Sequence, residues 1–248
     1  GQPISLPASC LPCLGPAWFA LHLPGSGPAL GGVTALQFLP ILVAAPYGGV
    51  IAGRFSKRRI LLATQTASGL LALTLGLLVT TGAIQLWMVY ALALGLGLVS
   101  AIDNPARQTF VHELVGPDRL RNAVALNSIE VNLSRVVGPA VAGVVIAAFG
   151  LGPCFLINAA SFVAVLLCLY LMSDDELHLG ARLERRKGQL VEGFLYAMRT
   201  PTVRVALIMM ALIGTFTYEF SVTLPLLAKF TFHAGAGTNA LLTSALGV

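Results

Sequence analysis

The chain alternates between long apolar stretches and short stretches that carry its charges. Residues 33–52 and 60–102 contain no charged side chain. About 20 apolar residues form an α-helix long enough to cross roughly 30 Å of hydrocarbon, so this pattern predicts membrane-spanning helices. The predicted spans cover about 33–52, 60–79, 85–102, 124–150, 151–172 and 205–228, and residues 239–248 are typical of the first turns of another.

The composition separates this chain from soluble proteins. It has 248 residues, of which 56% are hydrophobic and 10% charged, against about 25% charged in soluble domains. The mean hydropathy of +0.85 agrees. A soluble fold would need six buried helices without polar faces, and a membrane β-barrel would need an alternation of period two that is absent here. The sequence therefore predicts an all-α membrane protein, built as a multi-span helical bundle.

The distribution of cations predicts the orientation of the spans. Three predicted loops, 53–59, 103–122 and 173–203, hold twelve of the 15 Lys and Arg residues. The alternate loops at 80–86 and 149–153 hold none, and Lys229 is the exception on that side. Because short cytoplasmic loops carry an excess of Lys and Arg, we expect a multi-pass protein of the cell membrane with its charged loops in the cytoplasm.

The first basic loop has a family pattern of its own. Gly49, Arg54, Lys57 and Arg58 fit a loop pattern with fixed spacing. In this pattern a glycine and three further residues precede an acid and an arginine, and one residue later a second glycine precedes two basic residues. This stretch resembles the loop between helices 2 and 3 of the major facilitator superfamily. Gly53 occupies the position of the expected acid and Ser56 that of the second glycine, so the resemblance is partial.

Two further stretches support the resemblance. "GPAVAG", with Gly138, Pro139 and Gly143, is similar to the glycine–proline motif of antiporters in this superfamily, although small-residue helix packing alone would also explain it. "AIDNPARQTFVHELVGPDRLRNAVALNS" (101–128) resembles the loop between helices 4 and 5 in the subgroup of drug and siderophore exporters labelled transmembrane secretion effectors. The resemblance covers about residues 30–248.

The resemblance implies a domain organisation. Members of the superfamily have twelve helices in two halves, with the transport cavity between the halves, so we expect a partial bundle of six to seven spans. The expected regions are an atypical first-helix region at 1–30, an N-terminal bundle at 31–172, a cytoplasmic connection at 173–203 and the start of a second bundle at 204–248. The first region is atypical because residues 1–28 contain six prolines, which are costly inside a helix. Within the connection, residues 187–199 predict an amphipathic surface helix.

Three ionisable residues inside predicted spans are candidates for transport or proton coupling. Glu219 could bind a proton when the site opens outward and release it inward, or it could simply reach the outer interface. Arg135 could attract an anionic substrate or pair with a carboxylate, or its charge could extend to the cytoplasmic surface. Glu130 lies in the same polar half of its span.

A second candidate group lies at the expected cytoplasmic gate. Asp103 and Arg107 are four residues apart, a spacing that permits an ion pair on one helix face, although Pro105 between them argues against a continuous helix. The resemblance implies that this pair helps to close the gate together with the basic loop at 54–59. It also implies a weakened gate here, because Gly53 replaces the acid of that loop.

The function that the sequence favours is secondary active transport. The resemblance implies proton-coupled export of a small amphipathic molecule, drug- or siderophore-like, by alternating access. The expected partners are the lipid bilayer, the substrate and either a missing C-terminal half or a second copy, and no cofactor is expected beyond the proton gradient. No ATP-binding loop, HExxH motif or nucleic-acid pattern is present, so an enzyme is not expected. The alternative is a transport-inactive remnant that acts at most as an assembly partner.

Overall fold

The computed structural model describes residues 26–115, 120–172 and 189–217, and beyond them 223–224, 226–231, 238, 242–243 and 245. All regular structure in these residues is helical, which confirms the all-α fold class. The helices are α2 (Ser26–Arg54), α3 (Lys57–Thr80), α4 (Leu86–Val115), α5 (Leu120–Phe149), α6 (Leu151–Leu171), α7 (Gln189–Arg199), α8 (Pro201–Thr217) and a π-helical turn, η4 (Leu227–Thr231).

Two helices extend beyond the predicted spans. α2 begins at Ser26 rather than near residue 33, and it includes Pro28. A proline is tolerated in a first helical turn, because the N–H groups there have no intrahelical acceptor. α4 continues to Val115 with Pro105 inside it, so the prediction of a loop from residue 103 onward was wrong for most of that stretch. The predicted first-helix region before residue 26 lies outside the described residues.

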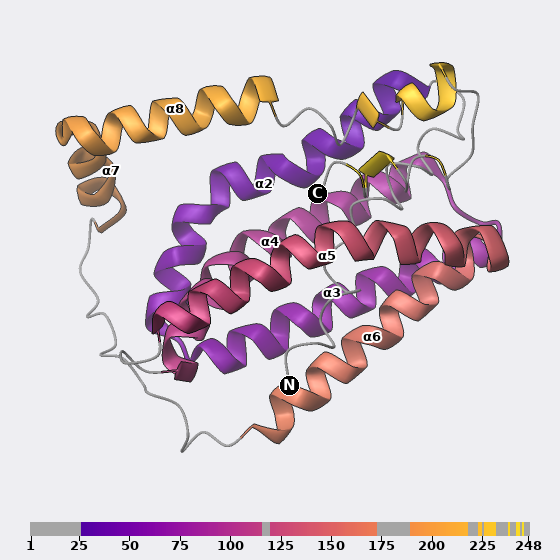
Figure 1. Cartoon of the computed structure of the whole chain (residues 1–248), viewed down its shortest axis with the longest axis horizontal. Coiled ribbons are helices and arrows are strands. Elements are labelled where there is room, and N and C mark those ends of the chain that lie inside the picture. Colours follow the sequence, from indigo (N-terminus) through magenta and orange to yellow (C-terminus); the bar gives the residue numbers. More distant parts are fainter. Residues whose placement is uncertain are drawn as a thin grey trace.

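Helices α2 to α6 run antiparallel to their chain neighbours and form a bundle (Figure 1). α2 packs along α4, and α3 packs along both α6 and α4. α5 contacts α6 and α4. One end of the bundle, on the left in Figure 1, holds the α2–α3 connection, the end of α4, the start of α5, the end of α6 and helix α7. We call this the charged end, because it carries Lys57, Arg58 and Arg59 at the start of α3.

The opposite end of the bundle has tight, uncharged turns that depend on glycine. Gly82 follows α3 with a φ of 69°, and Gly150 alone separates α5 from α6 with a φ of 85°. A positive φ is readily adopted only by glycine. These two positions therefore set the short connections between α3 and α4 and between α5 and α6.

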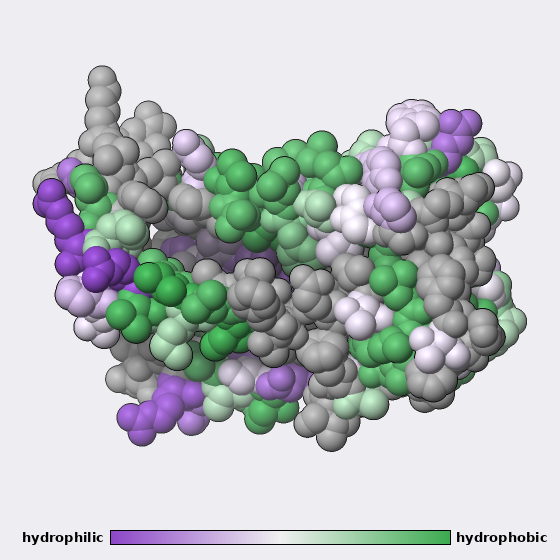
Figure 2. Space-filling model, turned by 90° about the horizontal axis from the view of Figure 1, so that it is seen from above, coloured by the Kyte–Doolittle hydropathy of each residue, from purple (hydrophilic) through white to green (hydrophobic). Residues whose placement is uncertain are grey.

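The outer surface of the bundle is apolar. Four helical stretches in the described residues are long and apolar enough to cross a membrane: Lys57–Thr80, Leu86–Val111, Arg121–Phe149 and Leu151–Leu171. Large hydrophobic side chains on these helices face outward, such as Val144 (70% exposed) and Tyr170 (73% exposed). Figure 2 shows hydrophobic side chains across the middle of the molecule and hydrophilic ones mainly toward its ends. A surface of this kind suits hydrocarbon rather than water.

Glycines allow α2 and α4 to approach closely. A methyl group added at Gly48 would overlap the main-chain carbonyl of Ala101, and one added at Gly97 would overlap that of Gln37. Small residues at helix contacts are typical of membrane bundles, where close packing replaces the hydrophobic effect as the driving force. The two glycines thus position the end of α4 that carries the polar residues described next.

Candidate functional site

A buried polar cluster joins α3 to α4 near the charged end. Asp103 of α4 accepts a hydrogen bond from the Thr64 hydroxyl (2.5 Å) and another from the Gln65 side-chain amide (2.9 Å), both at its Oδ1 atom. Its other oxygen accepts from Arg107, with Nη2 at 3.0 Å and Nε at 3.2 Å. Thr64, Gln65 and Asp103 are each less than 10% exposed.

The cluster compensates the burial of a carboxylate. Removing a charged group from water is costly unless hydrogen bonds and an opposite charge replace the hydration. Asp103 receives donors from α3 at one oxygen and the guanidinium of its own helix at the other. The arrangement is therefore specific to one placement of α3 against α4.

The ion pair between Asp103 and Arg107 forms because α4 continues as a helix through Pro105, where the sequence argued against a continuous helix. The two residues lie one helical turn apart, and the pair spans Pro105 within α4. Pro105 lacks the N–H that would bond to the carbonyl of Ala101, yet it leaves the side-chain spacing of the turn intact. The side chain of Arg107 is 43% exposed and that of Asp103 is 10% exposed, so the pair extends from the interior to the surface.

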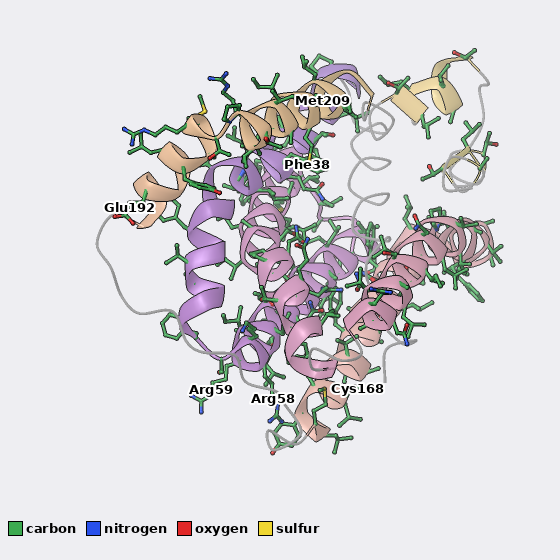
Figure 3. The ribbon with its side chains drawn as sticks, turned by 60° about the vertical axis from the view of Figure 1, so that its left-hand side comes forward. Phe38, Arg58, Arg59, Cys168, Glu192 and Met209 are labelled. Atoms are coloured by element: carbon green, nitrogen blue, oxygen red, sulfur yellow. The ribbon has the colours of Figure 1, made fainter. Side chains whose placement is uncertain are left out.

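Arg58 connects the basic loop to a different helix. Its Nε donates to the carbonyl of Leu169 (2.9 Å), and its Nη2 donates to the carbonyl of Tyr170 (2.8 Å). These are among the last carbonyls of α6. Such carbonyls have no N–H donor within the helix, and they lie at the negative end of the helix dipole. Figure 3 shows Arg58 beside the end of α6 near Cys168, whereas Arg59 points away from it.

Apolar side chains pack beneath these polar contacts. Ile60 and Leu61 of α3 form a cluster with Ala106 and Phe110 of α4, and Leu169 of α6 packs against it. The cluster brings α3, α4 and α6 together at the charged end. Arg58, Arg107 and Asp103, three residues of the predicted gate, therefore surround one packed core in this region.

The other predicted gate residues contribute less to the described contacts. Gly49 is exposed, and a methyl group added there would meet nothing within 4 Å. Lys57 is the first residue of α3 and is half-buried. Arg54 is the last residue of α2, and its side chain lies outside the described residues. The structure thus brings Arg58 into contact with α6 while Gly49 faces away from the packed helices.

The antiporter-like motif lies on the buried side of α5. Gly138, Pro139 and Gly143 are all buried, and Pro139 is inside the helix. Next to them, Ala142 of α5 packs against Cys154 of α6. Small residues at this point suit a close approach of the two helices.

The candidates for proton coupling are only partly described. Glu130 is half-buried on α5, and its main-chain carbonyl accepts a hydrogen bond from the Ser134 hydroxyl (2.8 Å). Arg135 is in the same helix, but its side chain lies outside the described residues, as does Glu219 altogether. The structure therefore does not bring these three residues together or separate them.

Sequence reasoning missed three residues of the charged end. Thr64 and Gln65 form two bonds to Asp103, and Gly48 contacts α4. The polar pair Thr64–Gln65 within an otherwise apolar stretch was a usable signal, since polar side chains at membrane depth need partners. Gly48 is next to Gly49, the glycine of the loop pattern. Only the packing of α2 against α4 shows that Gly48 is the one in contact with α4.

The long apolar helices and the buried polar cluster define a multi-pass membrane protein. The family described as transmembrane secretion effector matches residues 10–248. The staphyloferrin A transporter of Staphylococcus aureus (strain NCTC 8325 / PS 47) is 34% identical over 158 residues, which cover 63% of this chain and 40% of that protein. The uncharacterized MFS-type transporter YfiS of Bacillus subtilis (strain 168) is 27% identical over 174 residues, which cover 68% and 40%.

The chain therefore belongs to the transmembrane secretion effector family of the major facilitator superfamily of transporters. This result confirms the resemblance found in the loops at 48–62 and 101–128. The chain spans about two fifths of the length of each of these two relatives.

Proposed function

We propose that the protein to which this chain belongs exports a small amphipathic molecule across the cell membrane by alternating access. The observation that carries the proposal is the joining of α3, α4 and α6 at the charged end, through Asp103 and Arg58. Alternating access moves one half of a transporter against the other as a nearly rigid body. Helices tied together in this way would move as a unit.

The substrate class rests on the family and its named relatives. One relative carries the name of a siderophore transporter, and the family description refers to secretion. A siderophore is small and combines polar and apolar parts, as many exported drugs do. We therefore propose a drug- or siderophore-like substrate, with the second half of the transport cavity supplied by a further bundle of the same protein or by a second copy.

Proton exchange is the proposed driving force, with Glu219 as the proton-binding group and Arg135 and Glu130 as its polar neighbours in the cavity. A carboxylate within a span is costly unless it is paired or faces water, and it therefore marks a candidate functional site. Proton-coupled export needs a group that binds a proton from outside and releases it inside, and a carboxylate such as that of Glu219 has the required chemistry. Arg135 would hold an anionic part of the substrate.

The test uses the full-length transporter in inside-out vesicles, with an amphipathic fluorescent dye and an iron-free siderophore as probes. Glu219→Gln is expected to abolish uptake driven by an imposed proton gradient and to preserve exchange between labelled and unlabelled probe. Glu192→Gln, on the exposed side of α7, is the control and should keep both activities. Unchanged gradient-driven uptake in Glu219→Gln would refute the coupling role.

The alternative proposal, an inactive membrane remnant or assembly partner, has its own experiment. The intact mass of the native gene product, extracted from its membrane, separates the two. A mass well above 25.9 kDa supports a complete exporter and justifies the vesicle assay. A mass of 25.9 kDa, together with no transport by the purified species, would support the remnant.

A further inference from the structure

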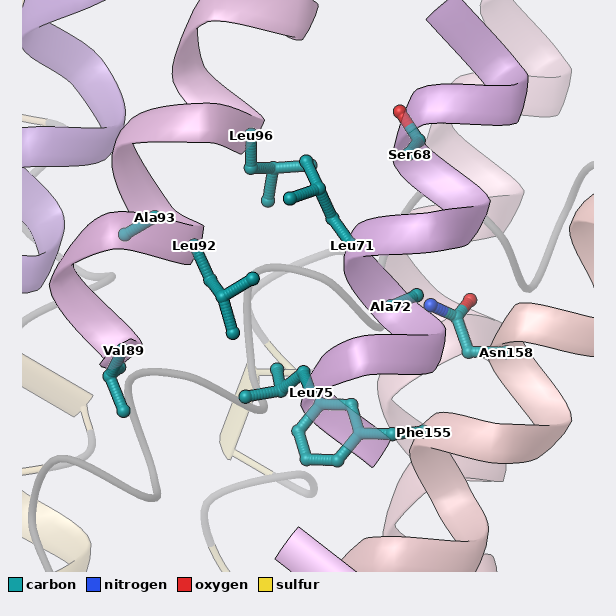
Figure 4. A pocket seen from close by; sticks show the side chains of 10 residues that line it. All are labelled: Ser68, Leu71, Ala72, Leu75, Val89, Leu92, Ala93, Leu96, Phe155 and Asn158. Carbon is teal, nitrogen blue, oxygen red and sulfur yellow. The ribbon is translucent and has the colours of Figure 1, made fainter. Parts of the chain in front are cut away.

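Helix α7 exposes apolar side chains although it is too short to span a membrane. Leu195 is 42% exposed and Met198 46%. The helix has 11 residues, whereas about 20 are needed to cross the hydrocarbon. Other apolar surface belongs to the long spans, and the apolar hollow between α3, α4 and α6 (Figure 4) also lies among those spans. The apolar side of α7 therefore needs a different explanation.

The apolar and polar side chains of α7 lie on different sides of the helix. Leu195 and Met198 are three residues apart, a spacing that places them on the same side. Glu192 and Tyr196 are four residues apart and lie on another side. Arg199 is four residues after Leu195 and borders the apolar side, where its aliphatic stem can lie along apolar surface. An amphipathic helix of this kind is typical of a membrane interface.

The position of α7 in the fold suits such an interface. α7 lies at the charged end and turns sharply away from α8, which runs along the bundle (Figure 1). The turn occurs at Thr200, because Pro201 has no N–H to continue the bonding pattern of α7 and restricts the residue before it. α7 thus runs across the direction of the spans, close to where they leave the hydrocarbon.

The charge around α7 favours an anionic surface. Between residues 182 and 204 the sequence has six basic side chains and two acidic ones. They are Arg182, Arg185, Arg186, Lys187, Arg199 and Arg204 against Glu184 and Glu192. Arg199 and Arg204 are exposed, and neither forms an ion pair with a described residue. A basic cluster on or beside an amphipathic helix attracts anionic lipids electrostatically.

We propose that α7 lies in the headgroup layer and binds anionic phospholipids through Arg199 and Arg204. Leu195 and Met198 enter the boundary between headgroups and acyl chains, and the two guanidinium groups donate to lipid phosphates. Zwitterionic lipids offer the same acyl chains without the net negative charge, so the surface distinguishes the two lipid classes by charge. The site does not depend on the proposed transport activity.

The test uses the full-length transporter without its native cysteines, in nanodiscs of zwitterionic lipid. A bimane fluorophore attached at Leu195→Cys reports nearby lipids, because a nitroxide on a lipid quenches it on close approach. We expect nitroxide-labelled phosphatidylglycerol to quench it about three- to fivefold more strongly than phosphatidylcholine with the same nitroxide. Equal quenching by the two lipids would overturn the proposal. So would no quenching by either lipid, since α7 would then lie outside the membrane.

Two charge variants show whether the preference comes from α7. Arg199→Gln combined with Arg204→Gln should reduce the ratio of quenching by the two lipids to about one. Arg59→Gln is the control, because it removes an exposed arginine from α3 at the same end of the bundle, and it should keep the ratio. A ratio that persists in the double variant would refute the role of these arginines. Where Leu195→Cys does not fold, the same measurement at Met198→Cys decides the outcome.

Discussion

The main-chain carbonyl of Ala101 in α4 lies directly against Gly48 of α2. Pro105, four residues later, has no N–H to pair with this carbonyl. The close approach of α2 therefore covers a carbonyl that the proline leaves without its helical donor. Asp103 follows two residues after Ala101, so this contact lies within one helical turn of the buried carboxylate.

Gly48→Ala should destabilise the protein because the added methyl group overlaps a main-chain atom that cannot move independently. Overpacking of this kind costs about 1–3 kcal/mol. Gly49→Ala is the matched control, since its methyl group would meet nothing within 4 Å and alanine favours a helix by about 0.5–1 kcal/mol. Thermal unfolding of both variants in detergent gives the comparison. Equal midpoints for Gly48→Ala and Gly49→Ala would contradict the close packing.

Asp103→Ala should be among the most destabilising changes at the charged end. It removes the acceptor of Thr64 and Gln65, both buried, and an unsatisfied buried group costs about 1–3 kcal/mol. Arg107→Gln should cost less than Asp103→Ala, because Asp103 keeps its two buried donors and water can partly replace a guanidinium that is 43% exposed. The free energy of unfolding by denaturant titration checks this order. A larger loss for Arg107→Gln would show that the ion pair, rather than the buried donors, stabilises the cluster.

Arg58→Ala should loosen the last turn of α6, since it removes the donors to Leu169 and Tyr170. Cys168, half-buried in that turn, reports the change through its rate of alkylation by a membrane-permeant maleimide. We expect an increase of about three- to tenfold, because losing charge-assisted bonds of about 1.5 kcal/mol raises local opening by about one order of magnitude at most.

Arg59→Ala is the control for this experiment, because Arg59 is exposed and points away from α6 (Figure 3). It should leave the alkylation rate of Cys168 unchanged, and Arg58→Lys should give an intermediate rate. The same rate in the Arg58 and Arg59 variants would mean that the guanidinium bonds do not hold the end of α6.

The two ends of the bundle should differ in their access from outside the cell. In a background without cysteine, Thr81→Cys at the uncharged end should react with a membrane-impermeant maleimide in intact cells. Arg59→Cys at the charged end should react only after permeabilisation, since Lys- and Arg-rich loops remain in the cytoplasm. The reversed result would place the charged end outside and would refute the proposed orientation.

Much of the fold was predictable because each span obeys one simple rule. Hydrocarbon requires a continuous run of apolar residues, so α3, α5 and α6 were located to within a few residues. The end of α4 was not predictable in this way. Pro105 and the charges after residue 102 are typical of a loop, but packing of Ala106 and Phe110 against α3 maintains the helix to Val115.

The polar site was predictable in its residue types but not in its pairs. Asp103 and Arg107 were identified from their spacing, and they form the expected ion pair. Thr64 and Gln65 were not recognised as partners, because their bonds to Asp103 join residues 38 and 39 positions apart. Arg58 was assigned to the same gate, yet its described bonds go to main-chain carbonyls of α6, which no side-chain pattern reveals.

The sequence by itself determined that this protein is a bundle of membrane-spanning helices, because the bilayer acts as a solvent that every span must match independently of its neighbours. Only the tertiary structure decided which helix faces which. In the folded protein Gly48, rather than Gly49, contacts α4. Thr64 and Gln65 are the donors to Asp103, and the end of α6 accepts the bonds from Arg58. Those choices depend on close packing and hydrogen-bond geometry between distant segments, which lipid-exposed hydrophobicity does not encode.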